Sequence, residues 1–154
     1  MASSQSMPPV SINQTAISAT LHCLTGCALG EIMGLVIGEA LGWLNVQTTI
    51  LAVALAFLFG YSLSILPLLK AKIALGTALG AVLAADTLSI ATMEVVDNGV
   101  MTLIPGAMEA GLVNPIFWSS MPLALAAAFV VAFPANRYLL QRGKGHALMH
   151  KYHG

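Results

Sequence analysis

The residues best suited to chemistry lie together in the segment HCLTGCALGE, residues 22–31. Cys23 and Cys27 are four residues apart, so on a helix both thiols project from one face, one turn apart. Thiolates and imidazoles bind soft metal ions, and His22 adjoins the first thiol. The segment therefore predicts a site for Cu(I) or another soft ion formed by His22, Cys23 and Cys27. The alternative is that both cysteines are small buried hydrophobic side chains, which is common for free cysteine.

Two carboxyl groups fall within long apolar segments. Glu31 lies one turn beyond Cys27, and Asp86 lies in a later segment of similar character. A charged side chain at the centre of a bilayer costs about 2.5–3.5 kcal/mol on insertion scales, and such residues usually have a function. We expect both groups at matching depth on a pathway for a cation or a proton. The alternative is that both are protonated and hydrogen-bond to Ser or Thr as part of helix packing.

Further acids and sulfur ligands follow toward the predicted outer surface. They are Glu39, Glu94, Asp97, Met93, Met101, Met108 and Met121. Thioethers are soft ligands, so thioethers outside and thiols inside would form a graded path for Cu(I), with Met93 and Glu94 among its ligands. Each methionine alone is more often packing filler.

The C-terminal sequence GKGHALMHKYHG adds three histidines at spacings of four and three residues: His146, His150 and His153. On a helix these rings share one face, and neutral imidazole is a common ligand for Zn, Cu and Ni. We expect a second group of metal ligands in this cytoplasmic tail, residues 143–154. The alternative is a solvated basic tail that its lysines attract to anionic lipid.

Long apolar segments must position these side chains. Hydrophobic residues make up 58% of the chain and charged residues 8%, whereas a soluble domain carries about 25% charged residues. A membrane-spanning helix needs about 20 mostly apolar residues. Four segments are long enough, at about residues 15–42, 46–69, 72–97 and 115–140. We therefore predict an all-α polytopic membrane protein, in which a four-helix transmembrane bundle, residues 15–142, follows a polar segment, residues 1–14.

Glycine and proline positions predict how these helices pack and connect. Glycines recur every four residues from Gly26 to Gly42, and such a stripe lets another helix approach closely. The small residues of the third segment make it the expected partner. Pro105 and Gly106 interrupt a moderately apolar run, so residues 98–114 are predicted to form a re-entrant or interfacial segment.

The six Lys and Arg residues all fall on one side of the predicted membrane. Two lie between the second and third segments, and four lie at or after the end of the fourth. Positively charged loops are retained on the cytoplasmic side, so both termini are predicted to be cytoplasmic. The expected location is the bacterial inner membrane, which the chain crosses several times.

Several classes of function are disfavoured. The chain lacks a nucleophile elbow, a phosphate loop, a dinucleotide fingerprint and a zinc-protease motif, so we expect neither an enzyme nor a bound nucleotide. One histidine lies within a predicted span, which argues against a bis-histidine haem. No stretch combines basic and aromatic residues in the manner of a nucleic-acid-binding surface.

Three motifs together resemble a family of small bacterial four-helix membrane proteins that is described as a domain of unknown function: HCLTGCALGE, DTLSIATMEVVDN and RGKGHALMH. The resemblance covers about residues 20 to 150 and implies the architecture but no activity. The chain also resembles, more loosely, the eukaryotic-type copper transporters, with which it shares outer methionines and a cytoplasmic end that carries His and Cys. The chain departs from them in its four predicted spans and in the absence of an MxxxM pair within one helix.

Three functions follow from these residues. The first is a homo-oligomer in membrane lipid that binds or transports a soft metal cation, with Cu(I) as the best candidate and a metal chaperone as a partner. The second is a proton-coupled transporter or channel for a small solute, in which Glu31 and Asp86 titrate. The third is an accessory subunit of a larger membrane complex, in which the glycine stripe docks a helix of another subunit.

Overall fold

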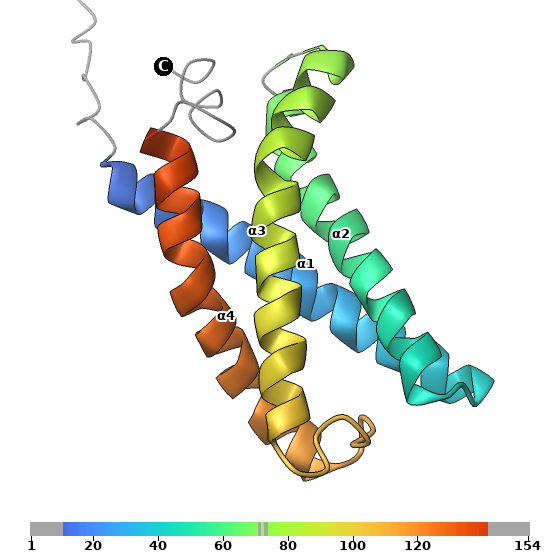
Figure 1. Ribbon diagram of the computed structural model, residues 1–154. Helices are drawn as coiled ribbons and strands as arrows, with labels where there is room; N and C mark the ends of the chain where they lie inside the picture. The colour runs from blue at the N-terminus through green and yellow to red at the C-terminus, as the bar shows by residue number, and fades with distance from the viewer. Residues whose placement is uncertain (1–10, 71, 73, 142–154) are drawn as a thin grey trace, which may run out of the picture.

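The computed structural model describes residues 11–70, 72 and 74–141, and within these residues the fold is all-α, as predicted (Figure 1). The helices are α1 (Ile12–Leu41), α2 (Asn45–Lys70), α3 (Leu75–Leu103) and α4 (Pro115–Gln141). Each overlaps one predicted span, and α3 differs most, because it runs six residues past its predicted end at 97. No strand is found in the described part of the chain.

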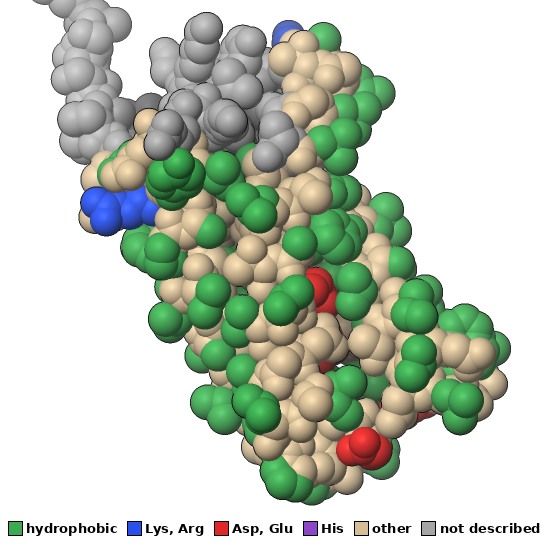
Figure 2. Space-filling model, viewed as in Figure 1, with side chains coloured by type: hydrophobic (Ala, Val, Ile, Leu, Met, Phe, Trp, Pro, Cys, Tyr) green, Lys and Arg blue, Asp and Glu red, His purple; other side chains and the backbone are tan. Residues whose placement is uncertain are grey.

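Three helical stretches are long and apolar enough to cross a membrane: α1, residues Asn45–Leu66 of α2 and residues Pro115–Leu139 of α4. Large hydrophobic side chains are exposed along all of them, and Figure 2 shows these side chains spread over the visible surface. Exposing so much apolar surface is unfavourable in water, whereas the same surface is favourable in contact with lipid. The helices thus point to a location in a membrane.

The glycine stripe of α1, defined here as Gly26, Gly30, Gly34 and Gly38, packs against α2. Each of these glycines faces one small residue of α2, in the pairs 26–60, 30–56, 34–52 and 38–48. A Cβ added at Gly26 would lie 2.6 Å from the Cα atom of Gly60, and one at Gly34 would lie 2.6 Å from the Cα atom of Ala52. Side chains cannot fit at such separations, so the two helix backbones are in direct contact.

This contact corrects the predicted pairing of the stripe with the third helix. Three residues, Gly42 to Leu44, separate α1 from α2, so α2 must turn back along α1. Gly42 makes this turn with a left-handed backbone (φ 65°), and its N–H donates to carbonyl groups at the end of α1. Because α2 covers the glycine stripe, the stripe is not left free to dock a second copy or another subunit.

The connection after α3 also differs from the prediction. Residues 98 to 103 continue α3, and the irregular segment starts at Ile104, just before Pro105. A proline lacks the N–H that a helix interior needs and disfavours helical backbone in the residue before it, which explains the position of this end. Residues 104–114 form turns.

Figure 1 shows α1 crossing behind α3 and α4, with its N-terminal end near the C-terminal end of α4. The connection between α2 and α3 lies at the same end of the molecule, and the α3–α4 connection lies at the opposite end. The Lys and Arg side chains that Figure 2 shows, in blue, are at the first of these ends. The described positive charges, those of Lys70, Lys72 and Arg137, are therefore segregated from the acids deeper in the bundle.

Gly30→Ala should destabilise the fold by about 1–3 kcal/mol, because the new methyl group would overlap the backbone of Ala56 and force the helices apart. Thermal unfolding in detergent measures the effect. Gly99→Ala is the matched control, since a Cβ at Gly99 in α3 meets nothing within 4 Å. Equal melting temperatures for the two variants would contradict the backbone contact.

Candidate functional site

The second stripe of α1, Cys23, Cys27 and Glu31, is rotated by one position from the glycines and faces α3 and α4. Both thiols are buried and free, and they pack with Met93 of α3 and with alanines of α4. The Sγ atom of Cys27 lies 4.0 Å from the Sδ atom of Met93. One turn further along α1, Glu31 interacts electrostatically with Asp97 and with its neighbour Glu94. The contacts follow one another in the same order along both helices, so α1 and α3 have the same chain direction where they cross.

This arrangement corrects the predicted matching depth of Glu31 and Asp86. Asp86 interacts with Cys23, whereas Glu31 interacts with Asp97. Asp86 and Asp97 are 11 residues apart on α3 (97 − 86), or about 16 Å along a helix axis. The prediction counted from helix starts at 15 and 72, but α1 begins three residues earlier and α3 begins three residues later.

Glu31, Glu94 and Asp97 line a cavity of about 40 Å³, which is called the carboxyl cavity below. This volume accommodates about three water molecules. The remaining lining comes from α1, α2, α3, the α3–α4 connection and the start of α4: Leu35, Thr48, Thr49, Ala52, Asn98, Met101, Ala107, Met108, Ala110 and Phe117. Figure 2 shows acidic side chains within a hollow between α3 and α2.

Asp97 is the most deeply buried of the three acids, with 5% of its surface exposed. Its Oδ1 atom has no hydrogen-bond partner among the described residues. Asn98 donates from Nδ2 to the Oε2 atom of Glu94 at 3.3 Å, and no Lys, Arg or His is found among the described residues that line the cavity. Burying a polar group without a partner is costly, and a bound proton or cation would remove that cost.

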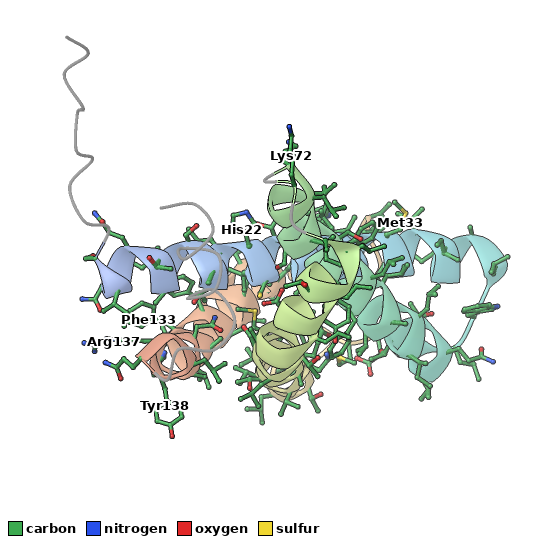
Figure 3. All side chains as sticks on the ribbon, turned by 90° about the horizontal axis from the view of Figure 1, so that it is seen from above. His22, Met33, Lys72, Phe133, Arg137 and Tyr138 are labelled. Carbon is green, nitrogen blue, oxygen red and sulfur yellow. The ribbon has the colours of Figure 1, made fainter. Side chains whose placement is uncertain are left out.

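His22 does not join the two thiols. Its side chain is exposed, and its Nδ1 atom donates to the carbonyl oxygen of Ser18 at 2.9 Å. Figure 3 shows His22 and Met33 on the side of α1 that faces away from α4. His22 and Cys23 are adjacent in the chain, but adjacent helix positions point about 100° apart.

The remaining predicted ligands divide in two. Cys27, Met93 and Glu94 are brought together with Glu31. Asp86 lies nearer the start of α3, beside Cys23 and Ser64. No group of three or more His, Cys, Asp and Glu side chains that could hold a metal ion is found within residues 11–70, 72 and 74–141. The predicted tail ligands, His146, His150 and His153, lie outside the described residues.

Asn136 of α4 joins three helices, and the sequence alone did not single it out. Its Nδ2 atom donates to the Oγ1 atom of Thr20 in α1 at 2.9 Å and to the Oγ atom of Ser89 in α3 at 3.0 Å. All three side chains are buried. The sequence did contain one signal for this link. Thr20 lies three residues before Cys23, so it extends the second stripe of α1 toward the helix start and places a hydroxyl group on the face that meets α3 and α4.

Glu39 holds the α3–α4 connection against the end of α1. Its Oε1 atom accepts a hydrogen bond from the backbone N–H of Leu112 at 2.8 Å. The carbonyl oxygen of Leu112 accepts another from Nε1 of Trp118 in α4, at 2.6 Å. Glu39 is absent from the cavity lining, so its role within the described residues is to anchor the loop that forms one wall of the cavity.

Fold and site together define a helical protein with three helices that could span a membrane and a partly open, carboxyl-lined cavity. The family model described as Domain of unknown function (DUF4396) matches residues 13–145, and the chain belongs to this family. The match agrees with the expected resemblance to a family of unknown function. Neither the curated proteins nor the solved structures contain a match to the chain.

Asn136→Ala should lower the free energy of unfolding by about 1–3 kcal/mol, because the hydroxyl groups of Thr20 and Ser89 would lose their buried donor. Thermal unfolding in detergent reports the change. Ser119→Ala, at an exposed position of the same helix, is the control and should have little effect. A similar small effect for both would show that the three-helix connection adds no stability.

Glu39→Ala should free the α3–α4 connection. A hydrogen bond to a charged group contributes about 1.5–3 kcal/mol, so amide exchange at Leu112 should accelerate by about tenfold or more. Hydrogen–deuterium exchange followed by mass spectrometry resolves this segment. Glu109→Ala removes an exposed acid from the same connection and should leave the exchange unchanged. Equal exchange in both variants would rule out the anchor.

Proposed function

We propose that the protein is a four-span integral membrane protein that binds a cation in the carboxyl cavity and moves it across the membrane. The observation that carries the proposal is the buried Oδ1 atom of Asp97, which lacks a protein partner in the described chain and lies with Glu31 and Glu94 around a small cavity. A proton or a metal cation is the partner that such carboxyl groups require. The leading alternatives are a proton, which the carboxyl groups themselves would bind, and a soft metal ion such as Cu(I), for which Cys27 and Met93 would supply sulfur ligands.

α3 is the fourth span in this proposal. Its 29 residues extend about 43 Å, more than the roughly 30 Å of the hydrocarbon core. Asp86 and Asp97 are buried and Glu94 is half-buried, so the acids of α3 face the bundle. This is the arrangement expected of ionisable residues within a membrane, because lipid cannot solvate them.

Charge supports the proposed orientation. The described positive residues are Lys70, Lys72 and Arg137, and they occupy the end of the molecule where α1 starts and α4 ends. The positive-inside rule assigns this end to the cytoplasm, which makes both termini cytoplasmic in an inner membrane. The carboxyl cavity then lies on the outer side of the bundle, nearer the α3–α4 connection.

A route from the cavity to the cytoplasmic end follows α3. Asp97, Met93, Ser89 and Asp86 recur every three or four residues and are all buried. This spacing places them on one helical face. Cys27 and Cys23 of α1 line the same side of the route, next to Met93 and Ser89. A cation that leaves the cavity therefore meets sulfur and oxygen ligands in succession.

Asp97→Asn and Glu31→Gln should each reduce cation flux by about tenfold or more, since loss of an interaction with a charged group costs about 1.5–3 kcal/mol. The purified protein is reconstituted in liposomes. A pH-sensitive dye reports protons, and elemental analysis of washed vesicles reports Cu(I). Glu109→Gln, an exposed acid of the connection, is the control and should retain the flux of the unmodified protein.

Two results would contradict transport. Equal flux in Asp97→Asn and in the control would remove the cavity from the route. An absence of flux in the unmodified protein, together with stable copurification of another membrane protein, would favour the accessory-subunit hypothesis.

A further inference from the structure

We propose that a soft monovalent metal ion, Cu(I) or Ag(I), binds between the sulfur atoms of Cys27 and Met93, next to Glu94. The inference rests on the proposed function because it takes the carboxyl cavity as the entrance for the ion. It joins a thiol of α1 to a thioether of α3 at one ion, whereas the sequence predicts a site formed by His22, Cys23 and Cys27 along a single helix.

The sulfur atoms are correctly spaced for this ligand set. A metal–sulfur bond is about 2.3 Å long, so two sulfurs on one ion are at most about 4.6 Å apart. The Cys27 and Met93 sulfurs are separated by 4.0 Å. One ion can therefore contact both in a bent arrangement with no displacement of α1 or α3. The competing interpretation is a weak hydrogen bond from the thiol to the thioether.

The chemistry of the three groups selects the ion. Thiolate and thioether ligands favour Cu(I) and similar soft ions. Glu94 interacts electrostatically with Cys27 and supplies a carboxylate oxygen beside the sulfur pair. When the metal–sulfur bond forms, the S–H bond of Cys27 breaks and its proton is released to bulk solvent. The positive ion and the thiolate cancel in charge, so a monovalent ion adds no net charge to the buried site.

The carboxyl cavity provides a path by which an ion could reach the two buried sulfur atoms. Met93 is fully buried and Cys27 is 3% exposed, so neither sulfur is open to the lipid-facing surface. Glu94 contacts the cavity on one side and Cys27 on the other. Acids at the cavity wall raise the local concentration of cations, which then reach the sulfur ligands.

Cys23 provides an internal comparison. It is as buried as Cys27 and lies one turn away on the same stripe. The polar neighbours of Cys23 on α3 are Asp86 and Ser89. The close approach to a methionine sulfur is made by Cys27, whose Sγ atom lies near the Sδ atom of Met93. A site formed by Cys27 and Met93 should survive the loss of Cys23, whereas a site shared by the two thiols should not.

The test measures Ag(I) binding to the purified full-length protein in detergent. All samples carry His146→Ala, His150→Ala and His153→Ala, so that imidazoles of the tail do not contribute. We expect about one Ag(I) per chain, with sulfur neighbours in the X-ray absorption spectrum. Cys27→Ser and Met93→Leu should each weaken binding by at least about tenfold, because the loss of even an outer partner costs a metal site about 10–100-fold.

Met121→Leu, at a buried methionine of α4, is the matched control and should retain binding. Cys23→Ser distinguishes the proposed Cys27–Met93 pair from a site shared by the two thiols. Melting temperatures establish that each variant is folded. Equal losses in Cys23→Ser and Cys27→Ser with retained binding in Met93→Leu would overturn the site in favour of the two thiols. The protein that carries only the three histidine substitutions keeps both Cys27 and Met93. If its X-ray absorption spectrum shows no sulfur neighbours of Ag(I), the proposed site is overturned, whatever the cysteine and methionine variants show.

The Ag(I)-binding test and the flux test can fail independently of each other. Proton flux that depends on Asp97, in a protein that binds no Ag(I), would overturn the sulfur site and support the transport proposal. Stoichiometric Ag(I) bound through sulfur, in a protein with no flux of any tested cation, would support the sulfur site and overturn transport.

Discussion

The direct backbone contact between α1 and α2 is the constraint on which the rest of the structure depends. Four glycines of α1 meet small residues of α2, and at Gly26 and Gly30 the nearest atoms of α2 all belong to its backbone. This contact fixes the rotation of α1 about its own axis. Because the second stripe is only one position away, fixing the glycines also directs Cys27 and Glu31 toward α3. The packing contact and the polar site are therefore two consequences of one helix sequence.

The sequence predicted the helices well, because long apolar runs bounded by polar or proline-containing segments determine where membrane helices begin and end. It failed on helix pairing. The small residues of α2 that receive the glycine stripe include Ala52 and Ala56, and alanine is ordinary in an apolar helix. Depth was also mispredicted, because an error of three residues at each helix start shifts one helix against the other by several ångströms.

The candidate site was predicted in its chemistry but not in its grouping. Cys27, Glu31, Met93 and Glu94 were all selected as ligands, and the structure brings them together. His22 was added because it is adjacent to Cys23, yet adjacency in the chain does not place two side chains on one helical face. The burial of Asp97 and the links made by Asn136 depend on contacts between distant segments. Composition and spacing do not encode such contacts directly.

The local character of the α1–α2 contact has a consequence for how the protein enters a membrane. The paired positions run from residue 26 to residue 60, so every residue of this contact precedes α3 in the chain. Helices that insert first provide a surface against which later helices pack. In the proposed four-span arrangement, the acid-bearing α3 would meet a hairpin that already presents thiols and a carboxyl group, so its own carboxyl groups would not face lipid alone. In that arrangement, the order of the helices in the chain would lower the cost of placing the buried acids of α3 in the bilayer.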